Sequence, residues 1–156
     1  VLKGHIAVAN SNLNRLKSAH LIDSLARKFL KKHGLDYPHG TGHGVGYFLN
    51  VHEGPIAISK GYKIKLKPGH VISNEPGFYK KGKFGIRIEN MIYVKQVKNK
   101  VFFENLTMVP IDKELINFNL LNKKEKNYLL NYNLRIYSNL EKYLNYKEKF
   151  WLLSQF

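Results

Sequence analysis

The chain has 156 residues and a formal net charge of +15, from 26 Lys and Arg against 11 Asp and Glu, and it contains no cysteine. The length allows one domain with a substantial core. The lack of cysteine excludes a disulfide scaffold, a zinc ribbon and a thiol catalyst. A hydrophobic content of 44% argues against intrinsic disorder. Because no apolar run is long enough for a membrane span and no export signal opens the chain, we expect a cytoplasmic protein without a membrane partner.

The positive charge has two interpretations. It is typical of proteins that bind nucleic acids. However, lysine greatly outnumbers arginine and is spread along the chain, as a codon-biased surface would produce. A specific nucleic-acid groove usually recruits arginine for bidentate contacts. We therefore expect no nucleic-acid partner, with RNA binding as the alternative.

Two helices are predicted before residue 39. Apolar residues recur at helical spacing from Leu2 to Leu16, with no capping residue in front of them. A second, amphipathic helix carries Leu21 on its apolar stripe, and Gly34 suits the left-handed residue that ends a helix. The uncapped start at Val1 leads us to expect that a larger domain continues in front of it.

Residues 39–97 are rich in glycine and β-branched residues, which predicts strands and turns. Strands are expected at 70–75, 84–97 and 101–109, and tight turns are expected at 81–83 and 98–100.

Helical spacing returns after residue 110. Asn122 followed by Glu125 predicts a capping box at the start of a long helix. The apolar C-terminal patch is expected to dock on the β region or on another subunit. Its residues are Phe150, Trp151, Leu152 and Phe156.

Three of the seven histidines, namely His39, His43 and His52, fall within one glycine-rich segment. Glycine lets the backbone pack closely, so that imidazoles can project into a cleft. Neutral imidazole is both a common metal ligand and a proton shuttle. The other four histidines lie on lysine-rich helices or in a turn, and we expect them to be surface or satisfied core residues. They are His5, His20, His33 and His70.

Two glutamates, Glu75 and Glu89, lie in segments that we expect to be buried strands. If these strands form an antiparallel pair turning at Gly82, the two carboxylates lie almost opposite each other. Facing carboxylates repel, so replacing either by glutamine should stabilise the metal-free chain. A divalent cation between them reverses the interaction, although Arg87 or a lysine could neutralise one of them instead. With one histidine nitrogen, this donor set suits Mn, Zn, Co or Fe.

Four segments together resemble the catalytic half of Xaa-Pro aminopeptidase (aminopeptidase P), a metallopeptidase of family M24 with the pita-bread fold. They are residues 39–46, 50–55, 74–79 and 85–90. Residues 1–8 and 106–111 resemble the family as well, so the resemblance spans essentially the whole chain. It implies an α/β (α+β) protein in which residues 1–110 form the second half of the pita-bread domain and residues 111–156 form a helical C-terminal extension.

The resemblance also implies a role for each candidate residue. His43, Glu75 and Glu89 would be ligands of a two-metal centre holding a divalent metal, expected to be manganese, with zinc or cobalt as alternatives. Glu75 would also be the general base toward the attacking water. His39 and His52 would be catalytic, binding the substrate and stabilising the tetrahedral intermediate. The substrate would be a peptide with proline in its second position.

The family's centre has five ligands, and two of them are aspartates from a segment that precedes the part resembled here. Asp23, Asp36 and Asp112 have no partner at the family's spacing. We therefore expect the chain to be inactive without a complementing half that carries those ligands, and its aromatic tail is compatible with a homodimer. A non-catalytic module that binds peptides or RNA, and the remnant of a degraded gene, remain the alternatives.

Overall fold

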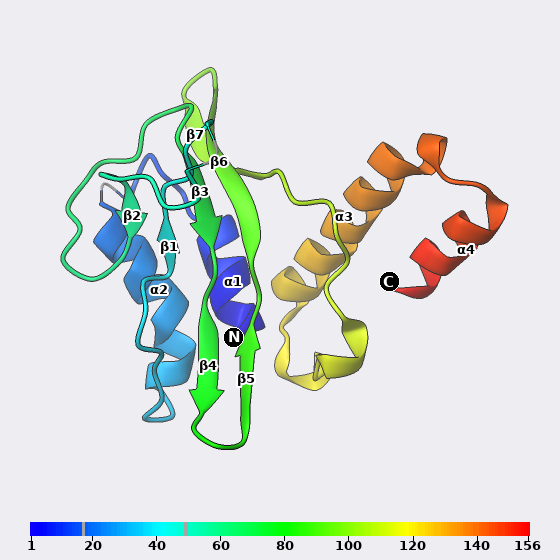
Figure 1. Ribbon diagram of the computed structural model, residues 1–156, viewed down its shortest axis with the longest axis horizontal. Helices are drawn as coiled ribbons and strands as arrows, with labels where there is room; N and C mark the ends of the chain where they lie inside the picture. The colour runs from blue at the N-terminus through cyan, green and yellow to red at the C-terminus, as the bar shows by residue number, and fades with distance from the viewer. Residues whose placement is uncertain (17, 49) are drawn as a thin grey trace. The chain divides into compact units, whose positions relative to one another are not determined.

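The computed structural model describes residues 1–16, 18–48 and 50–156 (Figure 1). These residues form two compact units, Val1–Thr107 and Met108–Phe156. Among the described residues, unit 1 holds two helices and the strands, and unit 2 is helical. The α/β class predicted from the sequence is therefore confirmed. No helix of the described ranges is long and apolar enough to cross a membrane.

The first helix, α1 (Leu2–Ala9), is shorter than the sequence predicts. Beyond it, short polar side chains form hydrogen bonds with main-chain groups. Ser11 Oγ donates to Ala7 O, and Asn12 Oδ1 accepts from the amide of Asn14. Such local bonds compete with the continuation of a helix. Leu13 nevertheless packs into the core. The apolar spacing was therefore a correct signal of burial but a wrong signal of helix length.

The second helix, α2 (Ala19–Lys31), ends as predicted, because Gly34 has a φ of +69°. The predicted apolar stripe is wrong at Leu21, which is 45% exposed. The buried residues of α2 include a charged pair; they are Ala19, Ile22, Asp23, Ala26 and Arg27. A hydrophobicity pattern does not show that two charged residues on a helix neutralise each other and can face the core.

A single long hairpin organises unit 1. β3 (Val71–Asn74) pairs with β6 (Asn90–Val97), and β4 (Gly77–Lys80) pairs with β5 (Phe84–Arg87). Figure 1 shows β3 and β4 running in line, with β6 and β5 alongside them. In both ladders the partners are symmetric about Gly82, which has a φ of +69°. The predicted turn at residues 81–83 is confirmed.

The hairpin is interrupted at residues 75–76 and 88–89. The expected strand 84–97 is therefore two strands, and the expected strand 70–75 ends at Asn74. Pro76 cannot donate a ladder hydrogen bond, although its carbonyl still accepts from the amide of Ile88 at 3.3 Å. The ladder stops at the two glutamates that the sequence analysis selected.

The remaining strands extend the structure on both sides of the hairpin. β7 (Lys100–Asn105) pairs with β6 and is shorter than the expected 101–109. β1 (Gly42–His43) pairs with β2 (Ala57–Ile58) and also lies against β3, where the amide of Glu75 donates to Thr41 O. A Cβ on Gly42 would overlap Ser73 O, so only glycine permits this approach.

The core of unit 1 joins α1 and α2 to this sheet, and in Figure 1 α1 lies behind β3 and β6. Its buried members are apolar. They are Val8, Leu13, Ile22, Ala26, Ile58, Leu66, Ile72, Ile92, Val94 and Phe103.

Unit 2 contains α3 (Lys123–Leu140), α4 (Tyr146–Ser154) and three short 3-10 helices, η1 (Lys113–Leu115), η2 (Phe118–Leu120) and η3 (Glu141–Tyr143). The predicted capping box is confirmed, because Asn122 Oδ1 accepts from the amide of Glu125 and Glu125 Oε2 accepts from the amide of Asn122. Tyr132, Ile136 and Leu152 form the core of this unit. One member of the expected C-terminal patch, Leu152, is thus buried within its own unit, while Phe150 and Trp151 are exposed.

Candidate metal centre

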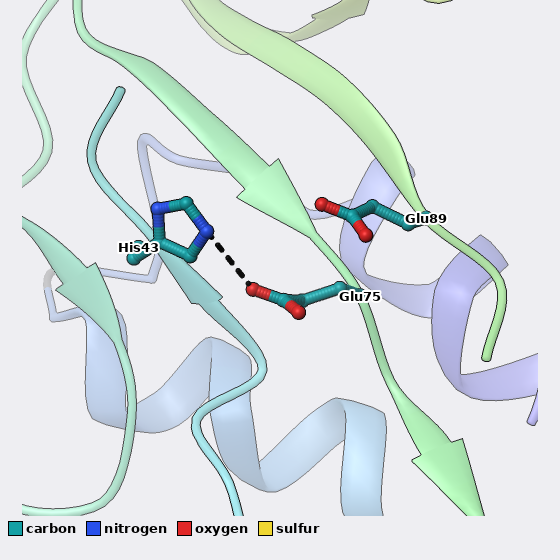
Figure 2. Close-up of side chains that lie close together, drawn as sticks. All are labelled: His43, Glu75 and Glu89. Carbon is teal, nitrogen blue, oxygen red and sulfur yellow. Dashed lines mark ion pairs between the residues drawn. The ribbon is translucent and has the colours of Figure 1, made fainter. Parts of the chain in front are cut away.

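Three side chains from separate elements converge in unit 1. His43 ends β1, Glu75 follows β3 directly, and Glu89 directly precedes β6. Figure 2 shows the three side chains directed toward one another. One possible ligand atom from each lies within 4.8 Å of the other two, and within the described residues this is the group that could hold a metal ion. The structure therefore brings together the histidine and the two glutamates that the sequence analysis selected.

The orientation of His43 is set by two hydrogen bonds. Its amide donates to Ser73 Oγ at 2.9 Å, and its Nδ1 lies 2.9 Å from Gly44 O. Because a carbonyl oxygen only accepts, Nδ1 carries a proton. Nε2 then points to Glu75 Oε1 at 3.2 Å. A histidine that donates through one ring nitrogen and presents the other to a site has the tautomer of a metal ligand.

Glu75 is 8% exposed and is held on both carboxylate oxygens. Oε1 accepts from Ser73 Oγ at 2.9 Å, and Oε2 lies 3.5 Å from Arg87 Nη1. Arg87 therefore supplies the positive charge that a buried carboxylate requires. The alternative raised from the sequence, that Arg87 neutralises one glutamate, is realised here together with the ligand cluster.

Glu89 is exposed, so the prediction that both glutamates are buried is wrong for this residue. The sequence Gly85–Asn90 alternates apolar residues in a way that favours burial, but β5 is exposed along its whole length. An exposed carboxylate beside a buried one leaves the cluster open to solvent on one side.

The donor set fits a divalent cation. One imidazole nitrogen and two carboxylates suit the borderline transition metals. Nε2 of His43 lies 3.2 Å from Glu75 Oε1, and a cation between this nitrogen and the carboxylates would be stabilised by all of them.

The other two predicted site histidines are connected to this cluster, His52 by a ring contact and His39 through hydrogen bonds. The ring centroid of His52 is 4.0 Å from that of His43. His39 is connected through hydrogen bonds: its Nε2 lies 2.8 Å from Tyr79 Oη, which accepts from Arg87 Nε at 2.8 Å. Tyr79 had not been selected, although it stands in the 74–79 segment that carries the family resemblance.

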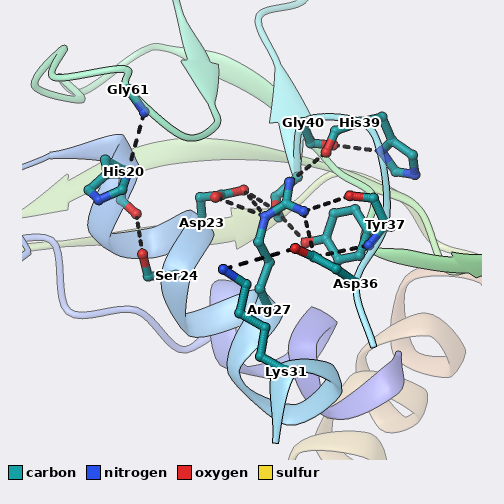
Figure 3. A network of polar contacts seen from close by, with 11 residues as sticks. His20, Asp23, Ser24, Arg27, Lys31, Asp36, Tyr37, His39, Gly40 and Gly61 are labelled. Carbon is teal, nitrogen blue, oxygen red and sulfur yellow. Dashed lines mark hydrogen bonds and ion pairs between the residues drawn. The ribbon is translucent and has the colours of Figure 1, made fainter. Parts of the chain in front are cut away.

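A buried network around Arg27 holds the segment that ends at His39 (Figure 3). Arg27 Nε donates to both oxygens of Asp23 at 3.0 and 2.9 Å, and Nη1 donates to Asp36 Oδ1 and Tyr37 O, both at 2.8 Å. Nη2 donates to the carbonyl of His39. The network shows that Asp23 and Asp36 are partners of Arg27. The sequence analysis had expected only that these aspartates do not replace the missing pair of ligands.

The pKa values of two residues in this network are shifted. Burial raises the pKa of Tyr37 to about 12, although the hydrogen bond with Thr41 acts in the opposite direction. For Asp36, partial burial is outweighed by the hydrogen bond from Arg27, which holds the pKa of that carboxyl below its usual value. Both shifts keep the network in one charge state, with a protonated phenol and an ionised carboxylate.

His5 was expected to be a surface or satisfied core histidine, and the structure shows a different environment. It is 0% exposed, and burial lowers its pKa to about 4, against the opposing effect of the carbonyls of Ile88 and Asn74. Its Nε2 has no hydrogen-bond partner within the described residues. The feature of the sequence that indicates the burial of His5 is its position between Gly4 and Ile6 on an apolar helix.

The comparisons with known proteins identify the family. Residues 1–96 match the model of metallopeptidase family M24, and residues 100–155 match the model of the C-terminal region of peptidase M24. The chain belongs to metallopeptidase family M24.

Its relatives carry more specific names. A probable Xaa-Pro aminopeptidase P of Botryotinia fuckeliana is 51% identical, over 88% of this chain and 23% of its own length. One of Fusarium vanettenii is 47% identical, over 92% of this chain and 25% of its own length. The chain thus spans about a quarter of the length of the curated relatives it matches.

Solved structures agree. The X-prolyl aminopeptidase of Caenorhabditis elegans, described as a cytosolic enzyme with a di-nuclear active site, superposes with a TM-score of 0.88 at 39% identity. The match covers 99% of this chain and 27% of that one. The prolidase of Pyrococcus horikoshii superposes with a TM-score of 0.60 at 33% identity, over 74% of this chain and 31% of its own. The predicted pita-bread fold and the predicted family are confirmed.

Proposed function

We propose that this chain provides three of the ligands, His43, Glu75 and Glu89, of a divalent metal centre in an Xaa-Pro aminopeptidase. The convergence of one imidazole nitrogen and two carboxylates within 4.8 Å carries the proposal. The names of the relatives and the dinuclear site of the C. elegans enzyme support it. We propose manganese as the metal, with zinc or cobalt as alternatives, and cytoplasmic location, since the C. elegans relative is described as cytosolic.

We further propose that residues 1–110 act as the second half of the pita-bread domain and residues 111–156 as its helical extension. The matches of the two family models support this division.

The side chains around the centre have chemically distinct tasks in this proposal. A divalent cation held there would polarise the peptide carbonyl and make water nucleophilic at neutral pH. Glu75, fixed by Ser73 and His43, would accept a proton from the attacking water. His52, whose ring lies beside that of His43, would donate a hydrogen bond to the developing oxyanion. His39, held by Tyr79, would contact the peptide that has proline in its second position.

The three ligands do not make a complete two-metal centre, since the described residues add no further carboxylate to the group. We therefore expect the chain alone to bind one metal ion and to hydrolyse no Xaa-Pro peptide. Activity is expected on mixing with a polypeptide that carries the two-aspartate segment of an Xaa-Pro aminopeptidase.

Two measurements test the proposal. Isothermal titration with Mn²⁺ should show uptake by the chain that Glu75→Gln abolishes and that Glu114→Gln, at an exposed site in unit 2, leaves intact. Hydrolysis of an Xaa-Pro tripeptide should require both polypeptides. Absence of metal uptake would refute the assignment of the ligands, and hydrolysis by the chain alone would refute the need for further ligands.

A further inference from the structure

His5, on α1, bonds to both sides of the interrupted hairpin. Its Nδ1 lies 3.2 Å from Ile88 O, and since the carbonyl can only accept, Nδ1 carries the proton. Its own main-chain carbonyl accepts from Asn74 Nδ2 at 3.0 Å. Asn74 immediately precedes Glu75, and Ile88 immediately precedes Glu89. One buried residue therefore contacts the neighbour of each candidate carboxylate ligand.

The position matters because the ladder does not hold the glutamates directly. Pairing between β3 and β6 stops at Asn74 and Asn90, and pairing between β4 and β5 stops at Gly77 and Arg87. Within the interruption the Ile88 amide donates to Pro76 O at 3.3 Å, and contacts from other elements add to this bond in setting the separation of the two strands. His5 supplies one such contact to each strand.

The chemistry of His5 also calls for an explanation. Nε2 is buried and has no hydrogen-bond partner among the described residues. An unsatisfied buried polar atom costs about 1–3 kcal/mol, a cost that a phenylalanine in the same volume would avoid. Violations of this kind are expected where a residue serves a function.

We propose that His5 is a positioning residue of the metal centre, setting the separation of Glu75 and Glu89 through its bonds to Asn74 and Ile88. This inference rests on the proposed function of the two glutamates as ligands. His5 does not touch the metal or the substrate.

The test is Mn²⁺ titration of the chain carrying His5→Phe, which keeps the ring volume and removes the Nδ1 proton. Loss of a supporting contact around a metal site typically weakens binding about 10–100-fold, and we expect the Mn²⁺ dissociation constant to rise about tenfold. His5→Asn, whose amide can donate near the position of Nδ1, should restore part of the affinity. The matched control is Ile6→Val, the buried neighbour on α1, which should lower stability without changing the affinity of the folded protein.

The outcomes separate this inference from the proposed function. If the folded His5→Phe chain binds Mn²⁺ like the unmodified chain while Glu75→Gln abolishes binding, the role of His5 is refuted and the metal centre stands. If the unmodified chain takes up no Mn²⁺, the proposed function fails, and the role of His5 fails with it.

A second measurement applies if His5→Phe does not fold. In the unmodified chain, titration with diamagnetic Zn²⁺ is followed by NMR at the His5 imidazole and the Ile88 carbonyl carbon. Both resonances should shift on saturation, because metal binding at Glu75 and Glu89 should change the hydrogen bond between His5 Nδ1 and Ile88 O. The resonance of the exposed His33 imidazole should not shift. Unchanged His5 and Ile88 resonances at saturating Zn²⁺ would overturn the inference.

Discussion

At the scale of single residues, the two candidate glutamates have different surroundings despite their symmetric positions in the hairpin. Glu75 is buried and accepts from Ser73, with His43 and Arg87 in reach, whereas Glu89 is exposed. Repulsion between the two carboxylates is therefore compensated on the Glu75 side. Substitution of the two residues should have unequal consequences.

Without metal, Glu75→Gln should destabilise the chain, because it removes the charge that Arg87 pairs with and weakens a hydrogen bond to a charged group. Such bonds contribute about 1.5–3 kcal/mol, so we expect a loss of about 1–2 kcal/mol. Glu89→Gln should be neutral or slightly stabilising, since it only relieves repulsion. Urea denaturation in EDTA measures both. The sequence analysis expected both variants to stabilise the metal-free chain, whereas the structure leads us to expect unequal effects. Equal effects of the two substitutions would contradict this structural expectation.

Stability should also depend on pH through His5. Its folded pKa of about 4 lies below the ordinary 6.5, so the unfolded chain binds more protons between these values and stability falls as pH falls through this window. The contribution is up to about 3 kcal/mol. On α2, which packs against α1, Asp23 and Arg27 form an ion pair with each other. Denaturation from pH 7 to 4 should give a steeper loss for the unmodified chain than for His5→Phe, with His33→Phe as the control. Parallel curves for His5→Phe and the unmodified chain would contradict the assignment.

At the scale of the elements, the site depends on how closely β1 approaches β3. His43 is carried by a strand of two residues, and its neighbour Gly42 lies against Ser73 without room for a Cβ. The geometry of the candidate metal centre therefore requires a glycine that has no chemical role of its own.

Gly42→Ala should separate β1 from β3, because the added carbon overlaps Ser73 O. Overpacking of this kind costs about 1–3 kcal/mol. The displacement should also weaken Mn²⁺ uptake, since the hydrogen bond from the His43 amide to Ser73 Oγ is made at the same point. Gly54→Ala is the matched control, because a Cβ there meets no atom within 4 Å. Thermal denaturation and Mn²⁺ titration of both variants test this, and equal behaviour would refute the packing argument.

The elements themselves were predicted unevenly from the sequence. The Gly34 helix end, the turn at Gly82 and the capping box at Asn122 were predicted correctly, because each depends on residues within one turn of the backbone. The length of α1 and the interruption of the hairpin were missed. Helix termination at Ser11 and Asn12 depends on competing side-chain bonds, and the interruption near Pro76 depends on a partner strand.

At the scale of the whole molecule, the net charge of +15 is the property with the broadest consequences. Two of the arginines that could read a nucleic acid, Arg27 and Arg87, are engaged in internal hydrogen bonds. The remaining positive charge is mainly lysine, which binds phosphate without base specificity.

Any RNA binding by this chain should therefore be sequence-independent and electrostatic. Such binding loses about 10³–10⁵ in affinity between about 50 and 200 mM salt when several phosphates are contacted. Fluorescence anisotropy with single-stranded poly(U) and poly(A) should show equal, salt-sensitive binding that disappears at the higher salt. Sequence-dependent binding that persists at about 200 mM salt would instead support the alternative of an RNA-binding module.

The sequence by itself determined the α/β class, the family and the residues that converge at the candidate centre, because these depend on local patterns and on motifs that keep their order along the chain. Only the tertiary structure decided that Arg87 pairs with Glu75, that Glu89 is exposed and that His5 lies between the two strands. Each of these depends on contacts between residues far apart in the sequence, such as His5 and Ile88. The burial and hydrogen bonding of a side chain are set by the elements packed around it, which a pattern along one segment does not describe.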